Sequence, residues 1–196
     1  MKTLHKTLLV LATGTLFTAG AQAAISYGNG MTAQPYLGAK IGQYDLNIDN
    51  ADKATSYGVY GGAKFTPYFG LEAEYLTTSD ENAGEDAVSK SEYSADTYGL
   101  YATADYAIPS ANGLYAKGRL GYAKNKVEVK DTVKSTNVKD TTKIDDTGVA
   151  GGLGLGFNVS PNASIEAMYN WYPSIDVDNG DSIDASGVTL GAHVKF

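Results

Sequence analysis

The residues of this chain that could do chemistry are charged side chains at alternate positions in otherwise apolar segments. A carboxylate pair such as Glu72 and Glu74 suits general acid–base catalysis, and charges facing one another can also line a hydrated pore. The same groups suit ion pairs, because five cations accompany four carboxylates and the two signs almost balance. We favour an ion-pair network over a pore lining, and both over catalysis. Its members are Lys40, Lys64, Lys117, Arg119 and Lys195 with Glu72, Glu74, Asp105 and Glu166.

Histidine, the commonest general base in enzymes, is scarce in this sequence. Only His5 and His193 are present, and His5 belongs to a segment that we expect to be removed. A hydrolase or acyltransferase would therefore need another general base. We expect His193 to be a packed or solvated residue without a chemical role, and we expect the protein not to be an enzyme.

The composition argues against metal, thiol and nucleic-acid chemistry. The chain has no cysteine, which excludes disulfides and thiolate metal sites. The acidic segment 176–181, followed by Asp184, offers oxygen ligands, but its fifth position is Gly180 and no closing glutamate follows. Lys and Arg total 15 against 22 Asp and Glu, and Arg119 is the single arginine, so we expect no cationic face for a phosphate backbone. We predict no metal, no cofactor and no nucleic-acid partner.

The first residues have the three-part pattern of a secretory signal peptide. Lys2 and Lys6 precede an apolar run over residues 8–17, and Ala21-Gln22-Ala23 supplies the small residues of a cleavage site. The apolar run has about a dozen residues, whereas a membrane-spanning helix needs roughly 20. We expect residues 1–23 to be removed and residues 24–196 to be exported as one acidic domain.

The elements that position the charges are strands, because apolar residues recur at every second position. The charges lie on the opposite face of each strand. This alternation fits a soluble lipocalin-like binder with its apolar face inside, and it fits equally a barrel whose apolar face meets lipid. The eight alternating segments are residues 37–42, 57–65, 69–75, 97–106, 114–122, 148–157, 163–171 and 187–196.

The connections between the segments alternate in length. Three are tight turns that each contain one proline, at residues 66–68, 109–113 and 160–162, and the other four are long and polar. Short turns on one side and long loops on the other are typical of outer-membrane barrels. Aromatic residues at both segment ends suit two membrane interfaces. They are Phe65, Phe69, Tyr106, Phe157 and Phe196 beside the short turns, and Tyr57, Tyr75, Tyr98, Tyr122, Tyr169 and Trp171 near the long loops.

The C-terminus carries a third indication. Thr189, Gly191, Val194 and the terminal Phe196 resemble the outer-membrane insertion signal that the barrel-assembly machinery recognises. With residues 35–42 and 64–75, which look like a first strand and a first short turn, the chain resembles the small eight-stranded outer-membrane barrels, the OmpA-like transmembrane domain and the OmpX/Ail type of surface protein. The resemblance covers residues 34–196. We expect no periplasmic domain of the kind that OmpA-like proteins often append.

This resemblance implies an eight-stranded antiparallel transmembrane up-and-down β-barrel in the outer membrane of a Gram-negative cell. It further implies that outer-membrane lipid and lipopolysaccharide surround the barrel and that the barrel-assembly machinery inserts it. The leading functional hypothesis is a non-catalytic surface protein that acts through its extracellular loops, in adhesion, host or phage contact, or envelope integrity. The alternative is a narrow pore for ions or small solutes.

Two of the long connections have distinct patterns. Residues 79–86 are acidic, and we expect repulsion from anionic lipopolysaccharide to keep this loop extended. Residues 126–144 continue the period-two pattern beyond any membrane span, which predicts a hairpin projecting into water. The edge of such a hairpin either recruits another chain by strand addition or simply stiffens the loop.

Deleting Phe196 tests the proposed insertion signal. Because the deletion removes the last element of that signal, we expect unfolded protein to accumulate in the periplasm while little reaches the membrane. Fractionation of cells expressing the full chain and the shortened chain measures this. Normal membrane levels of the shortened chain would contradict the prediction.

Overall fold

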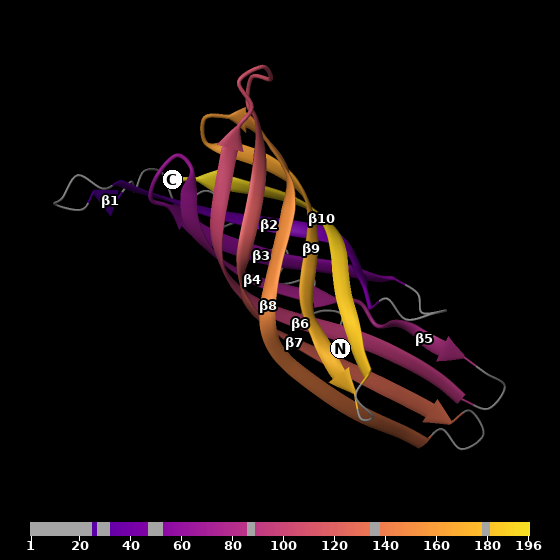
Figure 1. Cartoon of the computed structure of the whole chain (residues 1–196). Coiled ribbons are helices and arrows are strands. Elements are labelled where there is room, and N and C mark those ends of the chain that lie inside the picture. Colours follow the sequence, from indigo (N-terminus) through magenta and orange to yellow (C-terminus); the bar gives the residue numbers. More distant parts are fainter. Residues whose placement is uncertain (1–24, 27–31, 47–52, 86–88, 134–137, 178–180) are drawn as a thin grey trace.

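A computed structural model describes residues 25–26, 32–46, 53–85, 89–133, 138–177 and 181–196 (Figure 1). The proposed signal peptide at residues 1–23 lies outside the described residues, so it stays a prediction. In the described part of the chain, no helix is long and apolar enough to cross a membrane.

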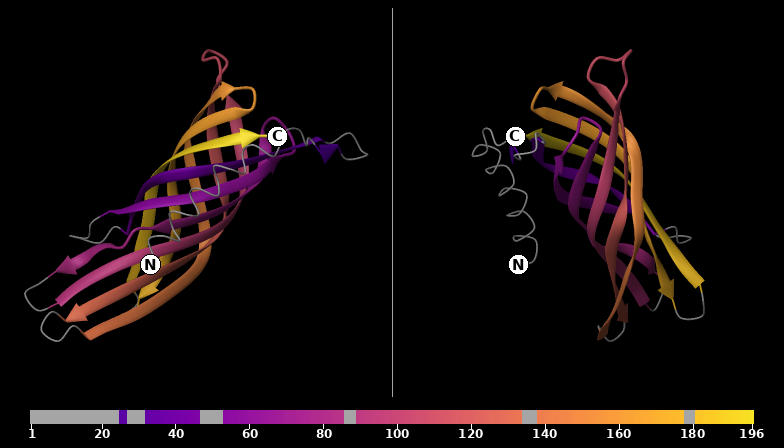
Figure 2. Two further views of the ribbon diagram at one scale, coloured as in Figure 1. Left: turned by 180° about the vertical axis from the view of Figure 1, so that it is seen from behind. Right: turned by 60° about the vertical axis from the view of Figure 1, so that its left-hand side comes forward.

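The described strands form a closed eight-stranded antiparallel β-barrel, which confirms the predicted fold (Figures 1 and 2). Each barrel strand pairs with its neighbour in the chain, and the first and last strands pair to close the cylinder. The barrel strands are β2 (Thr32–Asp45), β3 (Ala54–Lys64), β4 (Phe69–Thr78), β6 (Ser89–Ala107), β7 (Leu114–Val133), β8 (Val138–Ser160), β9 (Ala163–Val177) and β10 (Asp181–Lys195).

Closure depends on the pairing of β2 with β10. Their register runs from Tyr36 opposite Lys195 to Asp45 opposite Ser186, without a register shift. Beyond the last strand residue, the backbone N–H of Phe196 donates to the carbonyl of Pro35 at 2.9 Å. The terminal residue therefore takes part in the seam that closes the barrel.

The three short turns are as predicted, and their local chemistry explains their tightness. In the β3–β4 turn, the Thr66 hydroxyl accepts hydrogen bonds from the backbone N–H groups of Tyr68 and Phe69, at 3.2 and 2.9 Å. In the β6–β7 turn, Gly113 has a φ of 86°, a left-handed conformation that favours glycine. All the short turns lie at one end of the barrel (Figure 2).

The long connections contain far more strand than the sequence predicted. Residues 81–85, expected to be loop, form β5 (Glu81–Glu85), which pairs with β6. A further short strand, β1 (Ile25–Ser26), pairs with β2. The predicted 126–144 hairpin is confirmed, since β7 and β8 pair without interruption out to Val133 and Val138. Strands β5 to β8 therefore extend beyond the rest of the barrel at the end opposite the short turns (Figure 1). We call the described residues of this part, 81–85, 89–95, 124–133 and 138–148, the extracellular sheet.

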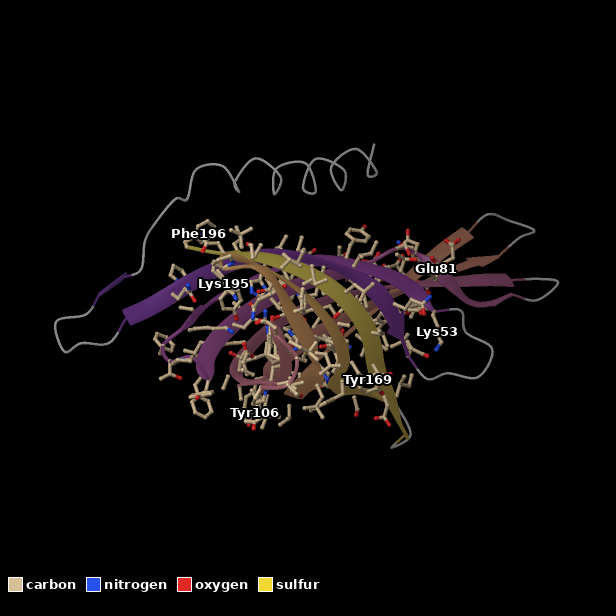
Figure 3. All side chains as sticks on the ribbon, turned by 90° about the horizontal axis from the view of Figure 1, so that it is seen from above. Lys53, Glu81, Tyr106, Tyr169, Lys195 and Phe196 are labelled. Atoms are coloured by element: carbon tan, nitrogen blue, oxygen red, sulfur yellow. The ribbon has the colours of Figure 1, made fainter. Side chains whose placement is uncertain are left out.

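The outward face of the barrel is apolar and carries many of the predicted aromatic residues. Leu100, Leu120 and Leu153 are about 60% exposed. Tyr106 and Tyr169 project outward from the wall in Figure 3. An apolar outward face is what the hydrocarbon core of a membrane requires of a barrel wall.

The interior has two layers, of which the sequence predicted one. Charged residues fill the layer nearer the short turns. Toward the other end the inward side chains become apolar and form a buried cluster, which we call the apolar cap. Its members are Tyr44, Leu46, Ala54, Leu76, Tyr93, Ala95, Val127, Tyr172 and Ala185, with Val129, Ile144 and Ile183 packed against them.

The apolar cap changes the interpretation of the β7–β8 hairpin. The hairpin was expected to stand in water, but Val127, Val129 and Ile144 on its inner face pack over the barrel mouth. Asn125 links the two layers, because its amide accepts a hydrogen bond from Thr97 at 3.1 Å and donates one to the Tyr44 hydroxyl. The described part of the hairpin extends beyond the rest of the barrel together with β5 and β6 (Figure 1).

Val127→Asp tests the apolar cap. The new carboxylate has no cation beside it in the cluster, so we expect the free energy of unfolding to fall by on the order of 3 kcal/mol. Urea midpoints of protein refolded in detergent measure the loss. Thr141→Asp, at an exposed position of the same sheet, is the control and should leave the midpoint nearly unchanged. Equal effects of the two changes would show that the cap is not a packed core.

Candidate functional site: the barrel interior

Six of the nine predicted charges meet in one buried cluster. It contains three cations and three carboxylates, so its net charge is zero, and we call it the central cluster. Lys117, Arg119 and Glu72 are only 3%, 4% and 1% exposed. Its members are Lys40, Lys117, Arg119, Glu72, Glu74 and Glu166.

Arg119 binds two carboxylates at once. Its Nη1 lies 3.0 Å from Glu72 Oε1 and 2.5 Å from Glu74 Oε2, while Nη2 donates to Asn170 Oδ1 at 2.7 Å. Lys40 also binds Glu74. The planar guanidinium suits such a shared position because its donors point in several fixed directions. Arg119 therefore joins β7 to β4 and β9 across the lumen.

Lys117 is the second bridge of the central cluster. Its Nζ lies 2.7 Å from Glu72 Oε2 and 3.0 Å from Glu166 Oε2. These carboxylates come from β4 and β9, so the lysine also spans the lumen. Together, Lys117 and Arg119 place every carboxylate of the cluster against a cation, as buried charges require.

The other three predicted residues lie outside the central cluster. Lys64 and Asp105 form a separate ion pair nearer the short turns. Lys195 Nζ donates to the side-chain oxygen of Asn158 at 2.6 Å, and the described residues give it no carboxylate partner within 4.0 Å. The structure thus divides the nine residues into a central cluster, one pair and one lysine held by an amide.

Inward tyrosines, which sequence reasoning missed, complete the site. Tyr36 donates to Glu72 at 3.0 Å and Tyr115 donates to Glu166 at 2.7 Å. The ring of Tyr101 lies 4.2 Å from the Arg119 guanidinium carbon, and that of Tyr60 lies 4.5 Å from Lys40 Nζ. The rings therefore stabilise the cations while three of the hydroxyls, including that of Tyr60, contact carboxylates or His193.

Each of these tyrosines lies directly opposite a glycine on the next strand. This pairing of an inward tyrosine with a glycine is the sequence signal that could have identified them. The pairs are Tyr36 with Gly62, Tyr60 with Gly38, Tyr101 with Gly121 and Tyr115 with Gly156. A Cβ at Gly156 would lie 2.1 Å from the Tyr115 ring, and one at Gly62 would lie 2.7 Å from the Tyr36 hydroxyl. A β8 glycine contributes in the same way, since a Cβ at Gly152 would lie 3.2 Å from Arg119 Nε.

His193 belongs to the margin of this site. It is 2% exposed, its Nδ1 lies 3.1 Å from the Tyr60 hydroxyl, and the same nitrogen lies 3.6 Å from Glu166 Oε1. A histidine beside a carboxylate and a tyrosine resembles an acid–base group, but a catalytic base must reach substrate. Buried under tyrosine rings, His193 is a packing residue of the lumen.

The acidic segment 176–181, for which we predicted no metal, is only partly described. Residues 178–180 lie outside the described residues, while Asp176 is the last residue but one of β9 and Asp181 begins β10. In the described part of the chain, no group of three or more His, Asp and Glu is arranged to hold a metal ion.

Comparisons with known proteins agree with this architecture. A family model described as an outer membrane protein beta-barrel domain matches residues 9–196. No curated protein sequence matches the chain. Among solved structures, Ail, the attachment invasion locus protein of Yersinia pestis, is 19% identical, with a TM-score of 0.55 over 84% of this chain and 97% of that chain.

Two further structures have similar scores. The N-terminal β-barrel domain of Pseudomonas aeruginosa OprF is 16% identical, with a TM-score of 0.55 over 83% of this chain and 97% of that chain. Ail in complex with the heparin analogue sucrose octasulfate is 16% identical, with a TM-score of 0.53 over 84% and 97%. At these identities, the likenesses show the fold.

Arg119→Ala tests whether the central cluster is dry. Removing the cation leaves two carboxylates short of a partner in a buried site, so we expect a loss of about 3 to 5 kcal/mol of unfolding free energy. The double change with Glu166→Ala should cost less than the sum of the single changes, because one charge of each sign is removed. Urea midpoints in detergent measure both. Lys124→Ala, which breaks an exposed ion pair with Asp145, is the control and should cost less than about 1 kcal/mol.

Proposed function

The chain belongs to the family of outer-membrane β-barrel domains, and on that premise we propose that it acts by surface contact through its extracellular sheet. Its location is the outer membrane of a Gram-negative cell. In such barrels the short turns face the periplasm and the longer connections face the outside. The extracellular sheet is then the part of the molecule that meets other cells, proteins or phage. We also expect lipopolysaccharide around the barrel and the barrel-assembly machinery as its insertion partner.

The observation that carries this proposal is the closed interior. The central cluster fills the lumen between β4, β7 and β9, and the apolar cap covers it on the outer side. An ion entering from outside would have to pass Tyr44, Tyr93 and Tyr172, whose side chains are buried in that cap. Apolar constrictions and paired charges both oppose conduction. This arrangement supports a non-catalytic surface role over the alternative of a narrow pore.

The outer edge of β8 supports contact with another molecule. Pairing of β8 with β9 begins at Gly151, so residues 138–150 have a described partner strand, β7, on one side. Thr141 and Lys143 are exposed there. Pro173 lies against Gly148 where β9 diverges, and proline has no N–H for a strand ladder. A partner can therefore approach this edge between residues 140 and 147, before Pro173 covers it.

Three lysines of the extracellular sheet are paired with carboxylates, and this pairing indicates which kind of molecule the sheet can bind. Lys130 binds Asp80 at 3.1 Å, Lys143 binds Glu128 at 3.2 Å, and Lys124 hydrogen-bonds Asp145 and lowers the pKa of that carboxyl. An Ail structure holds a heparin analogue, and a polyanion of that kind needs cations that are not already paired. In this chain the paired lysines favour a protein surface of mixed charge over a sulfated sugar.

Trimming the β7–β8 hairpin tests the proposal. Replacing residues 130–141 with Asn-Gly joins Val129 to Thr142, which are opposite each other, so the apolar cap stays intact. We expect binding of the expressing cells to host cells, matrix proteins or phage to fall to background, with unchanged protein in the membrane. Replacing residues 178–180 with Asn-Gly, on the same side of the barrel, is the control and should leave binding unchanged.

Two outcomes would overturn this proposal. Binding that survives the trimmed hairpin would show that the extracellular sheet is not the contact surface. Steady, large channels formed by the wild-type protein in planar bilayers would favour the pore. We expect the wild type to conduct weakly or not at all, and conductance to appear once Arg119→Ala breaks the central cluster.

A further inference from the structure

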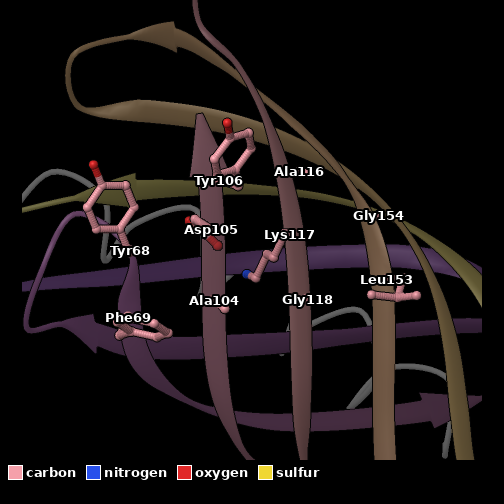
Figure 4. Close-up of a pocket in the computed structure, with 10 residues that line it drawn as sticks. All are labelled: Tyr68, Phe69, Ala104, Asp105, Tyr106, Ala116, Lys117, Gly118, Leu153 and Gly154. Carbon is pink, nitrogen blue, oxygen red and sulfur yellow. The ribbon is translucent and has the colours of Figure 1, made fainter. Parts of the chain in front are cut away.

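The lipid-facing wall is not uniform, because one hollow interrupts it close to the short turns. The hollow has a volume of about 550 Å³ and is lined by residues of β4, β6, β7 and β8 together with Tyr68 of the β3–β4 turn (Figure 4). Asp105 and Lys117 also border it, but both are buried residues of the interior ion pairs. The surface that the hollow presents to the membrane is therefore apolar.

The register of the strands explains the shape of the hollow. Phe69, Ala104, Gly118 and Leu153 lie in one row across four strands, each directly opposite the next. The two outer members are large and about 60% exposed, and the two inner members are small. Phe69 and Leu153 thus form the two walls of the hollow, and Ala104 and Gly118 between them form its floor.

Gly118 on the floor has no steric reason to be glycine. A Cβ built there would meet only Leu153, at 3.5 Å, which is ordinary van der Waals contact. At every other described glycine, a Cβ would lie within 3.4 Å of a neighbouring atom. Since glycine in a strand costs stability relative to alanine, packing within the protein does not account for the empty space at Gly118.

The mouth of the hollow has a different chemistry from its floor. Tyr68 and Tyr106 lie at the end nearest the short turns, and both hydroxyls point toward that end in Figure 4. Tyrosines at this level of a membrane protein place their hydroxyls among the lipid headgroups. An apolar trough below two hydroxyls matches an amphiphile with a long chain and a polar head.

We infer that this hollow is a binding site for one phospholipid of the periplasmic leaflet. One acyl chain lies in the trough over Ala104, Ala116 and Gly118, and the glycerol–phosphate region accepts hydrogen bonds from Tyr68 and Tyr106. The hollow is continuous with the lipid-contact surface of the barrel and opens at its periplasmic edge, where phospholipid is the neighbouring lipid. Among the described residues that line the hollow, the only charged ones are Asp105 and Lys117, and both are ion-paired, so chain shape and not headgroup charge selects the ligand.

Filling the hollow tests this inference. The full mature chain is refolded into vesicles of phosphatidylethanolamine and phosphatidylglycerol, transferred to mild detergent, and analysed by native mass spectrometry. We expect one phospholipid to remain on the wild type, with no preference between the two headgroups. The larger side chain of Ala116→Leu should displace about two methylene groups of the acyl chain from the hollow. The lipid-bound fraction should therefore fall about tenfold.

A matched control is available at the same depth of the membrane. Ala167 lies in the same row as Ala116, beyond Leu155 of β8, and faces outward away from the hollow. Ala167→Leu should therefore retain the lipid. Gly118→Ala, which the fold accepts without a clash, should give an intermediate loss and keeps the test decisive if Ala116→Leu fails to fold.

Several outcomes would overturn the inference. They are a wild type without bound lipid, equal retention by Ala116→Leu and the wild type, and equal loss in Ala167→Leu. Light scattering gives a further outcome, since a wild-type dimer that Ala116→Leu converts to a monomer would assign the hollow to a second copy of the chain. Retention of lipopolysaccharide in preference to phospholipid would assign it to the other leaflet.

Discussion

The structure depends on one constraint, which is that eight strands closed into a barrel leave a lumen wide enough only for side chains. In the membrane-spanning layer the outward face is apolar, as lipid requires, and the charged side chains lie on the inward face. Polar and charged groups are therefore forced into a space with little room for water, and they must satisfy one another. The central cluster is the result, with three cations matched to three carboxylates and Arg119 shared between Glu72 and Glu74.

The arrangement of the central cluster is limited by the volume of the lumen as well as by the need to pair charges. Tyrosine rings fill the space around the cluster only because each lies opposite a glycine, as Tyr115 lies opposite Gly156. The rings stabilise Lys40 and Arg119, and their hydroxyls help to satisfy Glu72 and Glu166. Charge pairing, ring packing and hydrogen bonding thus form one dense unit. A filled lumen is the reason why we propose a role for the outer strands rather than for the interior.

The two ends of the barrel face different solvents, and the strands differ accordingly. At the outer end, β5 to β8 continue past the membrane, and inward residues such as Tyr93 of β6 and Val127 of β7 are apolar and pack in the cap together with Leu76 of β4. At the periplasmic end the strands stop at tight turns, and the membrane-facing wall ends in tyrosines. At the outer end, where water surrounds the strands, their apolar side chains are buried inside the cap. Within the membrane, the apolar side chains face outward and contact lipid.

The sequence by itself determined the fold class and the inward position of the charges. Period-two alternation is a local property, so Lys117, Arg119 and Glu166 could be placed on the same side of their strands from spacing alone. Which charges meet was decided by register across the closed sheet, which brings Arg119 to Glu74 and leaves Lys195 with Asn158. The length of β6 was also underestimated, since the strand begins at Ser89 and not at Thr97. The apolar cap and the lipid-facing hollow arise where distant strands lie in one row, and only the tertiary structure sets those rows.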